Sequence, residues 1–125
     1  MVVDSSMVCA VLFDEPERGQ AQSRLAGRHL VAPQLLDHEV ANVAVKKQRK
    51  GMPESAVEQA LADYLSQDIE LMNTDIAAQY ALARQYGLSA YDAAYLWLAA
   101  DLKTPLATFD RQLAEAARAH LSTLK

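Results

Sequence analysis

Four carboxylate side chains stand where an α/β domain could bring them together. Asp4 ends the short apolar segment 1–4, Asp110 follows the apolar segment 104–109, and each comes directly before a predicted helix. Ligands of open α/β sheets bind outside the carboxyl ends of the strands, so both positions are suited to a functional site. Each Asp also has a structural explanation, because Asp is a preferred helix N-cap.

Two further acids lie on helix faces that are otherwise apolar. On a helical wheel Glu39 falls between Leu35 and Val43, and Asp92 falls beside Leu96 on another predicted helix. A carboxylate among apolar neighbours is unfavourable unless a partner compensates for its lost hydration. We therefore expect both acids to face a common partner near the ends of the strands.

The four acids together predict a divalent-metal site. Carboxylates cannot share a pocket as bare anions, so either some bind protons or a cation neutralises them. Oxygen ligands with no imidazole or thiolate companion favour Mg²⁺ or Mn²⁺. Such ions make a water more nucleophilic and clamp phosphate oxygens, which indicates metal-dependent hydrolysis of a phosphodiester. Asn42, three residues after Glu39, is close enough to orient the same site.

Short apolar segments alternate with helical patterns along the chain. The alternation predicts right-handed crossovers and one three-layer α/β/α domain over residues 1–125, with a central parallel sheet of four or five strands covered on both faces. The predicted strands are residues 1–4, 29–32, 69–72 and 104–109, with a fifth at 120–123. The predicted helices are residues 5–13, 14–26, 34–49, 53–66, 74–86, 90–100 and 110–119.

The composition is that of an ordinary globular domain of 125 residues, with 51% hydrophobic and 22% charged residues. No apolar run is long enough for a membrane span and no basic signal-peptide region precedes the first strand, so we expect a cytoplasmic protein. The single cysteine, Cys9, excludes an internal disulfide and stands among core-type residues. The net charge of −4 argues weakly against an extensive nucleic-acid surface, although Lys46, Lys47 and Arg49 form a basic cluster. This cluster is either a phosphate contact or a solvated helix end.

Other phosphate-handling domains fit less well. A receiver domain would need an Asp directly after the third strand, where Asn73 stands, and a haloacid-dehalogenase-type phosphatase would need an Asp at the position of Ser6. The sequence contains no glycine-rich phosphate loop, and its three histidines give no triad signature.

Four segments resemble the PIN-domain ribonucleases, and more narrowly the VapC toxins of type II toxin–antitoxin modules: residues 2–6, 33–42, 88–99 and 105–113. Tyr-Asp-Ala-Ala-Tyr at 91–95 and Ala-Thr-Phe-Asp at 107–110 are the most specific of these matches. The resemblance covers nearly the whole chain. It implies that Asp4, Glu39, Asp92 and Asp110 bind Mg²⁺ or Mn²⁺. It also implies that Ser5 or Ser6 and Thr108 support the site as small polar neighbours.

The same resemblance implies an RNA substrate, often transfer RNA, a VapB-type antitoxin that holds the enzyme inactive, and a homodimer. Lys46, Lys47 and Arg49 are then the candidate RNA-backbone contacts. We assign the aromatic residues Tyr91, Tyr95 and Trp97 to the core or a subunit interface rather than to base stacking. Two alternatives remain open: a housekeeping PIN nuclease that is not a toxin, and a PIN-like binding module that acts through its antitoxin complex.

Overall fold

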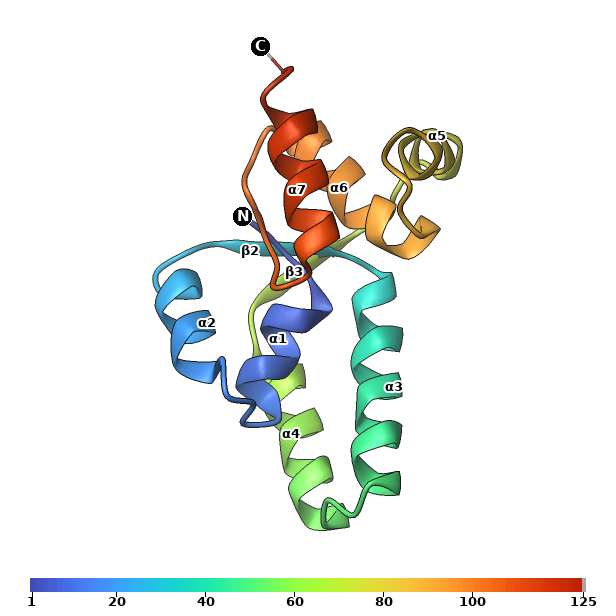
Figure 1. Ribbon diagram of the computed structural model, residues 1–125. Coiled ribbons are helices and arrows are strands. Elements are labelled where there is room, and N and C mark those ends of the chain that lie inside the picture. The colour runs from blue at the N-terminus through green and yellow to red at the C-terminus, as the bar shows by residue number, and fades with distance from the viewer. Residues whose placement is uncertain (125) are drawn as a thin grey trace.

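A parallel four-stranded sheet lies at the centre of residues 1–124, which are the residues that the computed structural model describes (Figure 1). Its strands are β1 (Val2–Val3), β2 (Leu30–Pro33), β3 (Ile69–Met72) and β4 (Leu106–Ala107). Their order across the sheet is β3-β2-β1-β4, and Val2 pairs with both Val31 and Leu106. The chain therefore moves outward from β1 to β3 and then returns to the other side of β1. This reversal places the topological switch point between β1 and β4.

Helices cover both faces of the sheet. They are α1 (Ser5–Leu12), α2 (Arg18–Leu25), α3 (Leu35–Arg49), α4 (Glu54–Ser66), α5 (Ile76–Tyr86), α6 (Ala90–Leu102) and α7 (Arg111–Leu121). Figure 1 shows α1 to α4 on one side of the strands and α5 to α7 on the other. Right-handed crossovers in opposite directions produce this division, because the connection from β3 to β4 runs against the two before it. The predicted three-layer arrangement is confirmed.

The helix α6 is buried on several faces and packs against β1, β2, β4, α5 and α7. The side chains of Ala93, Leu96 and Leu98 are fully buried. Ser89 is the N-cap and accepts a hydrogen bond from the backbone N–H of Asp92 at 3.1 Å. The cap fixes where α6 begins, and its start agrees with the helix predicted from residue 90. Within residues 1–124, no helix has the length and apolar character that crossing a bilayer requires.

Two predicted elements differ from the structure. The fifth strand predicted at 120–123 is wrong, because α7 continues to Leu121 and the Ser122 and Thr123 hydroxyls donate to the carbonyls of Ala119 and His120. The helix predicted from residue 14 begins only at Arg18, after a tight turn in which Asp14 has a φ of 51°. Short apolar and polar runs are ambiguous between strand, turn and helix, which explains both errors. The predicted domain also includes Lys125, which lies outside the described residues.

Gly87 joins α5 to α6 in a conformation that favours glycine. Its φ is 65°, and its N–H donates to the carbonyl of Ala83. We expect Gly87→Ala to lower the free energy of unfolding by about 1 kcal/mol, because a Cβ is unfavourable in the left-handed region. Gly19→Ala is the matched control: Gly19 lies within α2, its added Cβ would meet nothing within 4 Å, and the change should be neutral or stabilising. Equal effects in urea denaturation would contradict the role of Gly87.

Candidate active site

Asp4 is the most enclosed of the four acids, with 5% of its surface exposed. It follows β1 and is the N-cap of α1, where it accepts the N–H of Met7 at 3.2 Å. The Ser6 hydroxyl donates to the same carboxylate at 2.7 Å, and the Thr108 hydroxyl donates to its other oxygen. Burial raises the pKa of Asp4; the three hydrogen bonds oppose this shift, and the charge of Asp110 adds to it.

Hydrogen bonds to the hydroxyls of Ser6 and Thr108 hold the segment after β4 against Asp4. The N–H of Asp110 donates to the Thr108 hydroxyl at 2.9 Å, and the N–H of Phe109 donates to Ser6 Oγ at the same distance. Asp110 is itself the N-cap of α7. Asp4 and Asp110 therefore combine the structural role foreseen for each with a shared position at the switch point between β1 and β4.

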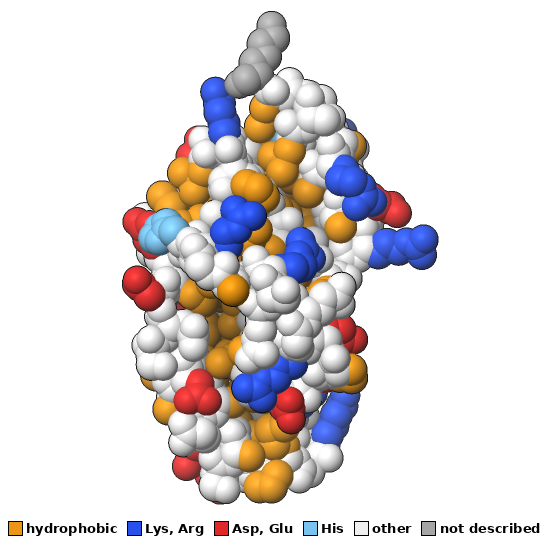
Figure 2. Space-filling view, turned by 90° about the vertical axis from the view of Figure 1, so that its left-hand side faces the viewer, with side chains coloured by type: hydrophobic (Ala, Val, Ile, Leu, Met, Phe, Trp, Pro, Cys, Tyr) orange, Lys and Arg blue, Asp and Glu red, His pale blue; other side chains and the backbone are white. Residues whose placement is uncertain are grey.

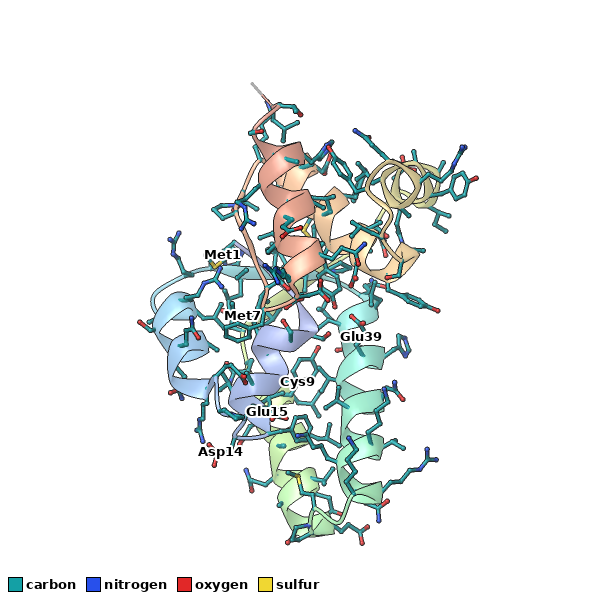
Figure 3. All side chains as sticks on the ribbon, viewed as in Figure 1. Met1, Met7, Cys9, Asp14, Glu15 and Glu39 are labelled. Atoms are coloured by element: carbon teal, nitrogen blue, oxygen red, sulfur yellow. The ribbon has the colours of Figure 1, made fainter. Side chains whose placement is uncertain are left out.

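Glu39 approaches from the first half of α3. Figure 3 shows it near the end of α3 that lies closest to the strands. The Tyr95 hydroxyl donates to Glu39 Oε1 at 2.5 Å, and Tyr95 is only 1% exposed. Burial raises the pKa of Glu39, as do the charges of Asp92 and Asp4, while the hydroxyls of Tyr95 and Ser5 oppose the shift.

Asp92 completes the arrangement from the first turn of α6. Burial raises its pKa, and the charges of Asp110 and Asp4 raise it further. Each of these effects requires the acids to be near one another. Four segments that are far apart in the sequence thus contribute carboxylates to one region, which we call the acidic cluster: Asp4, Glu39, Asp92 and Asp110.

The acidic cluster fits a hydrated divalent cation by its chemistry. In residues 1–124, the salt bridges pair Asp14, Glu15, Glu70 and Glu115 with Arg, Lys or His side chains and include none of the four cluster acids. No three His, Cys, Asp or Glu side chains in this range are already placed to hold one ion directly. Mg²⁺ commonly keeps several waters and uses only one or two carboxylates, so it does not require three side chains that converge on one ion.

Comparison with known proteins identifies the family. The family model of the PIN domain matches residues 1–119. The chain belongs to the PIN-domain family. Ribonuclease VapC3 of Pyrobaculum aerophilum is 31% identical over 121 residues, which is 92% of each chain.

Two solved structures share the PIN fold. The crystal structure of PAE2754 from Pyrobaculum aerophilum matches with a TM-score of 0.75 and 21% identity, over 98% of this chain and 92% of that one. The structure of Mycobacterium tuberculosis VapC20, titled a sarcin-ricin loop cleaving toxin, matches with a TM-score of 0.66 and 15% identity, over 92% of this chain and 93% of that one.

The remaining predicted site residues lie at different distances from the acidic cluster of this PIN domain. Ser6 and Thr108 contact Asp4 directly, as described, and Asn42 is exposed on α3. Lys46, Lys47 and Arg49 occupy the last turn of α3, seven to ten residues beyond Glu39 and therefore roughly 10–15 Å along the helix. Lys47 pairs with Glu15. The basic cluster is thus set apart from the acids by two to three helical turns.

Sequence reasoning missed one contact within the acidic cluster and one beside it. The pairing of Tyr95 with Glu39 had one available signal, since Tyr95 stands three residues after Asp92 and so shares its helix face. Arg24 of α2 donates to the carbonyl of Thr108 at 3.4 Å and, with Arg118, lines a hollow of about 420 Å³ beside β4. Figure 2 shows several Lys and Arg side chains on the side of the molecule that faces left in Figure 1. No motif in α2 pointed to Arg24.

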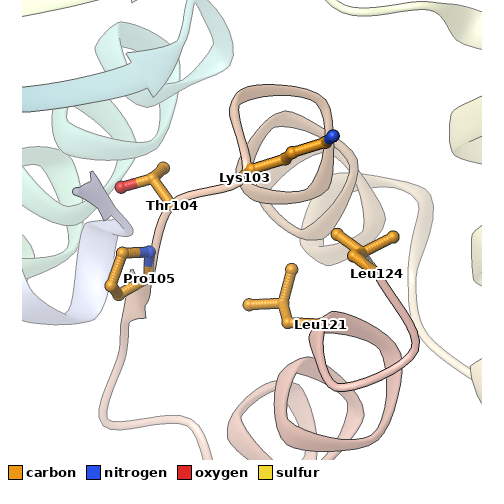
Figure 4. A pocket seen from close by; sticks show the side chains of 5 residues that line it. All are labelled: Lys103, Thr104, Pro105, Leu121 and Leu124. Atoms are coloured by element: carbon orange, nitrogen blue, oxygen red, sulfur yellow. The ribbon is translucent and has the colours of Figure 1, made fainter.

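Other hollows surround the domain, and two include residues of the predicted site. One of about 510 Å³ is lined by Glu39 and Asn42 and one of about 350 Å³ by Ser5 and Ser6, each with further residues. A hollow of about 460 Å³ lies before β4, at the opposite end of that strand from Asp110 (Figure 4). Its lining contains none of the four cluster acids: Lys103, Thr104, Pro105, Leu121 and Leu124.

The three aromatic residues assigned to the core or an interface have different surroundings. Tyr95 is buried and Trp97 is half-buried, which agrees with the core assignment. Tyr91, in the first turn of α6, is 65% exposed, so it does not lie in the core, and its assignment to a subunit interface stays a prediction.

The raised pKa of Glu39 predicts a pH-dependent stability without metal. In the unfolded chain Glu39 has its ordinary, lower pKa. Above about pH 4 the folded protein therefore binds more protons than the unfolded chain, and its free energy of unfolding falls as the pH rises until Glu39 is ionised in both states. Glu39→Gln should remove this part of the slope. In EDTA, the variant should gain melting temperature relative to the parent between pH 4 and pH 7, whereas the exposed control Glu58→Gln should not. A parallel pH dependence of parent and Glu39→Gln would contradict the assignment.

Tyr95→Phe tests the hydrogen bond that holds Glu39. The variant leaves a half-buried carboxylate without this donor, and we expect the free energy of unfolding at pH 7 to fall by about 1–3 kcal/mol. The loss should shrink at acidic pH, where Glu39 is protonated, and its raised pKa moves that change upward from the ordinary range of a Glu. Tyr80→Phe, at an exposed tyrosine of α5, should change little in the same denaturation series. A loss that is equal at both pH values would indicate a packing effect instead.

Proposed function

We propose that this PIN domain is a Mg²⁺- or Mn²⁺-dependent endoribonuclease that acts as the toxin of a VapBC-type toxin–antitoxin module. The observation that carries the proposal is the acidic cluster. Burial and the charges of neighbouring acids raise the pKa values of Asp4, Glu39 and Asp92, and in residues 1–124 no salt bridge pairs any of the four acids with a basic side chain. Such a site is unfavourable for the apo fold and favourable for a divalent ion. The 31% identity to a protein named a ribonuclease supports RNA as the substrate.

The residues of the acidic cluster have different roles in the proposed reaction. A bound divalent ion would neutralise charge on the phosphate and make a water more nucleophilic. Asp4 is the rigid member, since three hydrogen bonds fix its carboxylate, and Tyr95 fixes Glu39. Asp92 and Glu39 have raised pKa values, which suits a carboxylate that accepts the proton of the attacking water near neutral pH.

The wider biological role follows from the family resemblance. We expect a VapB-type antitoxin as the partner that holds the nuclease inactive, a homodimer as the assembled form of the toxin, and structured RNA, often transfer RNA, as its substrate. Lys46, Lys47 and Arg49 lie too far along α3 to reach the phosphate at the acids, so their role would be contact with the RNA backbone beyond the cleaved bond.

Cleavage by the purified chain, freed of any partner, tests the activity. The parent should cut RNA internally with Mg²⁺ or Mn²⁺ and not with EDTA. Asp92→Asn should lower the rate at least about a hundredfold while the far-ultraviolet circular dichroism stays unchanged. Asp101→Asn, an exposed acid on the same helix, is the matched control and should cleave like the parent.

The outcomes separate the alternatives. Full activity of Asp92→Asn would overturn the metal-site assignment, and absence of cleavage with every RNA and metal would favour the binding module. Expression of the parent should arrest growth, and coexpression of the small protein encoded beside it should relieve the arrest. Cleavage without growth arrest would favour a housekeeping nuclease.

A further inference from the structure

The hollow of about 510 Å³ beside Glu39 has a chemistry unlike that of the acidic cluster. Its lining comes from α3 and the start of α6, and consists of Leu35, His38, Glu39, Asn42 and Tyr91. The three residues Leu35, His38 and Asn42 lie on one face of α3, since their spacing is three and four. Tyr91 faces them from the adjacent helix and is 65% exposed. The hollow therefore offers one aromatic ring, an aliphatic side chain and two exposed polar groups.

The backbone that carries Tyr91 is held on both sides. Ser89, two residues before it, caps the helix, and Gln79 of α5 donates to the carbonyl of Ala90 at 2.7 Å. Thr74 in turn donates to the side-chain oxygen of Gln79 at 2.8 Å. An aromatic ring on a fixed backbone loses little conformational entropy when a ligand stacks on it, because it has only two side-chain torsions.

We propose that this hollow binds one unpaired nucleobase of the RNA, stacked on Tyr91 and contacted at its edge by His38 and Asn42. The inference rests on the proposed ribonuclease function and adds a base-binding subsite to it. Glu39 belongs to both the hollow and the acidic cluster, so the bound base would belong to a nucleotide beside the cleaved phosphate. Stacking requires that the base be free of its duplex, so cleavage is directed to single-stranded or looped RNA.

The charge of the lining favours a base over other ligands. Among residues 1–124 no Lys or Arg lines the hollow, and Glu39 supplies a negative charge that would repel a phosphate. A nucleobase is uncharged, flat, and rich in donors and acceptors at its edge, which matches a Tyr ring with His and Asn beside it. Because Tyr91 is exposed, packing of the core does not account for an aromatic ring at this place.

Cleavage of matched oligonucleotides tests the subsite. The substrates are a single-stranded RNA with one mapped cleavage site and the same RNA with an abasic nucleotide at each position around that site. One abasic position should lower the kcat/KM of the parent roughly five- to a hundredfold, the range found for stacking on one aromatic side chain. Tyr91→Ala should lose a similar factor on the intact RNA, mainly through KM, and should no longer distinguish the abasic RNA. Tyr91→Phe should retain the discrimination.

A control variant and a folding measurement accompany this test, and two results would contradict the subsite. Tyr80→Ala, an exposed tyrosine of α5, should cleave both RNAs like the parent, and melting temperatures should show that every variant is folded. An equal loss by Tyr91→Ala on intact and abasic RNA would overturn the subsite while cleavage itself stands. Full activity of Tyr91→Ala, together with failure to bind antitoxin or to self-associate, would assign the ring to a protein interface instead.

Binding measurements distinguish failure of the subsite from failure of the proposed function. If the parent cleaves no RNA with any metal, fluorescence anisotropy measures its binding to a labelled single-stranded RNA, intact and with an abasic nucleotide at each position in turn. A Tyr91-dependent preference for the intact RNA would retain the subsite and reject the nuclease. Equal binding of both RNAs, or binding of neither, would reject both.

Discussion

The buried carboxylate of Asp4 is the constraint on which the arrangement of the site depends. A carboxylate so far from water requires hydrogen-bond donors, and it receives them from Ser6 in its own helix and from Thr108 after β4. The Thr108 hydroxyl also accepts the N–H of Asp110. The need to satisfy one buried charge therefore fixes the ends of β1 and β4 against each other and sets where Asp110 begins its helix.

A second constraint acts through α6. Its alanines and leucines pack on the sheet and on neighbouring helices, so its axis has little freedom. Asp92 and Tyr95 occupy the edge of that helix that faces the ends of the strands, and the Tyr95 hydroxyl reaches Glu39 on α3. The apolar packing thus holds polar groups at a place where their charges oppose one another. Proteins commonly accept such local destabilisation where a ligand relieves it.

The two sides of the site differ in what they offer a substrate. The acidic cluster would bind a cation, and the cation in turn would bind a phosphate. The hollow beside it supplies the Tyr91 ring and, among the described residues, no Lys or Arg, which suits an uncharged base. Basic groups such as Arg24 and Lys46 lie further out, where a nucleic-acid backbone could continue. Separation of these chemistries over one surface is consistent with a polymer substrate that extends beyond the reacting bond.

The sequence by itself determined the parallel sheet, most helix positions and the places of Asp4 and Asp110 between a strand and a helix, because hydrophobic periodicity and capping are local properties of the chain. It gave the wrong structure for residues 120–123, where a short apolar run fits a helix end as well as a strand. Only the tertiary structure decided that Tyr95 meets Glu39 and that Tyr91 stays exposed beside it. A helical wheel shows which residues share a face. What stands opposite that face depends on how separate helices pack, and that packing places the acids in one cluster.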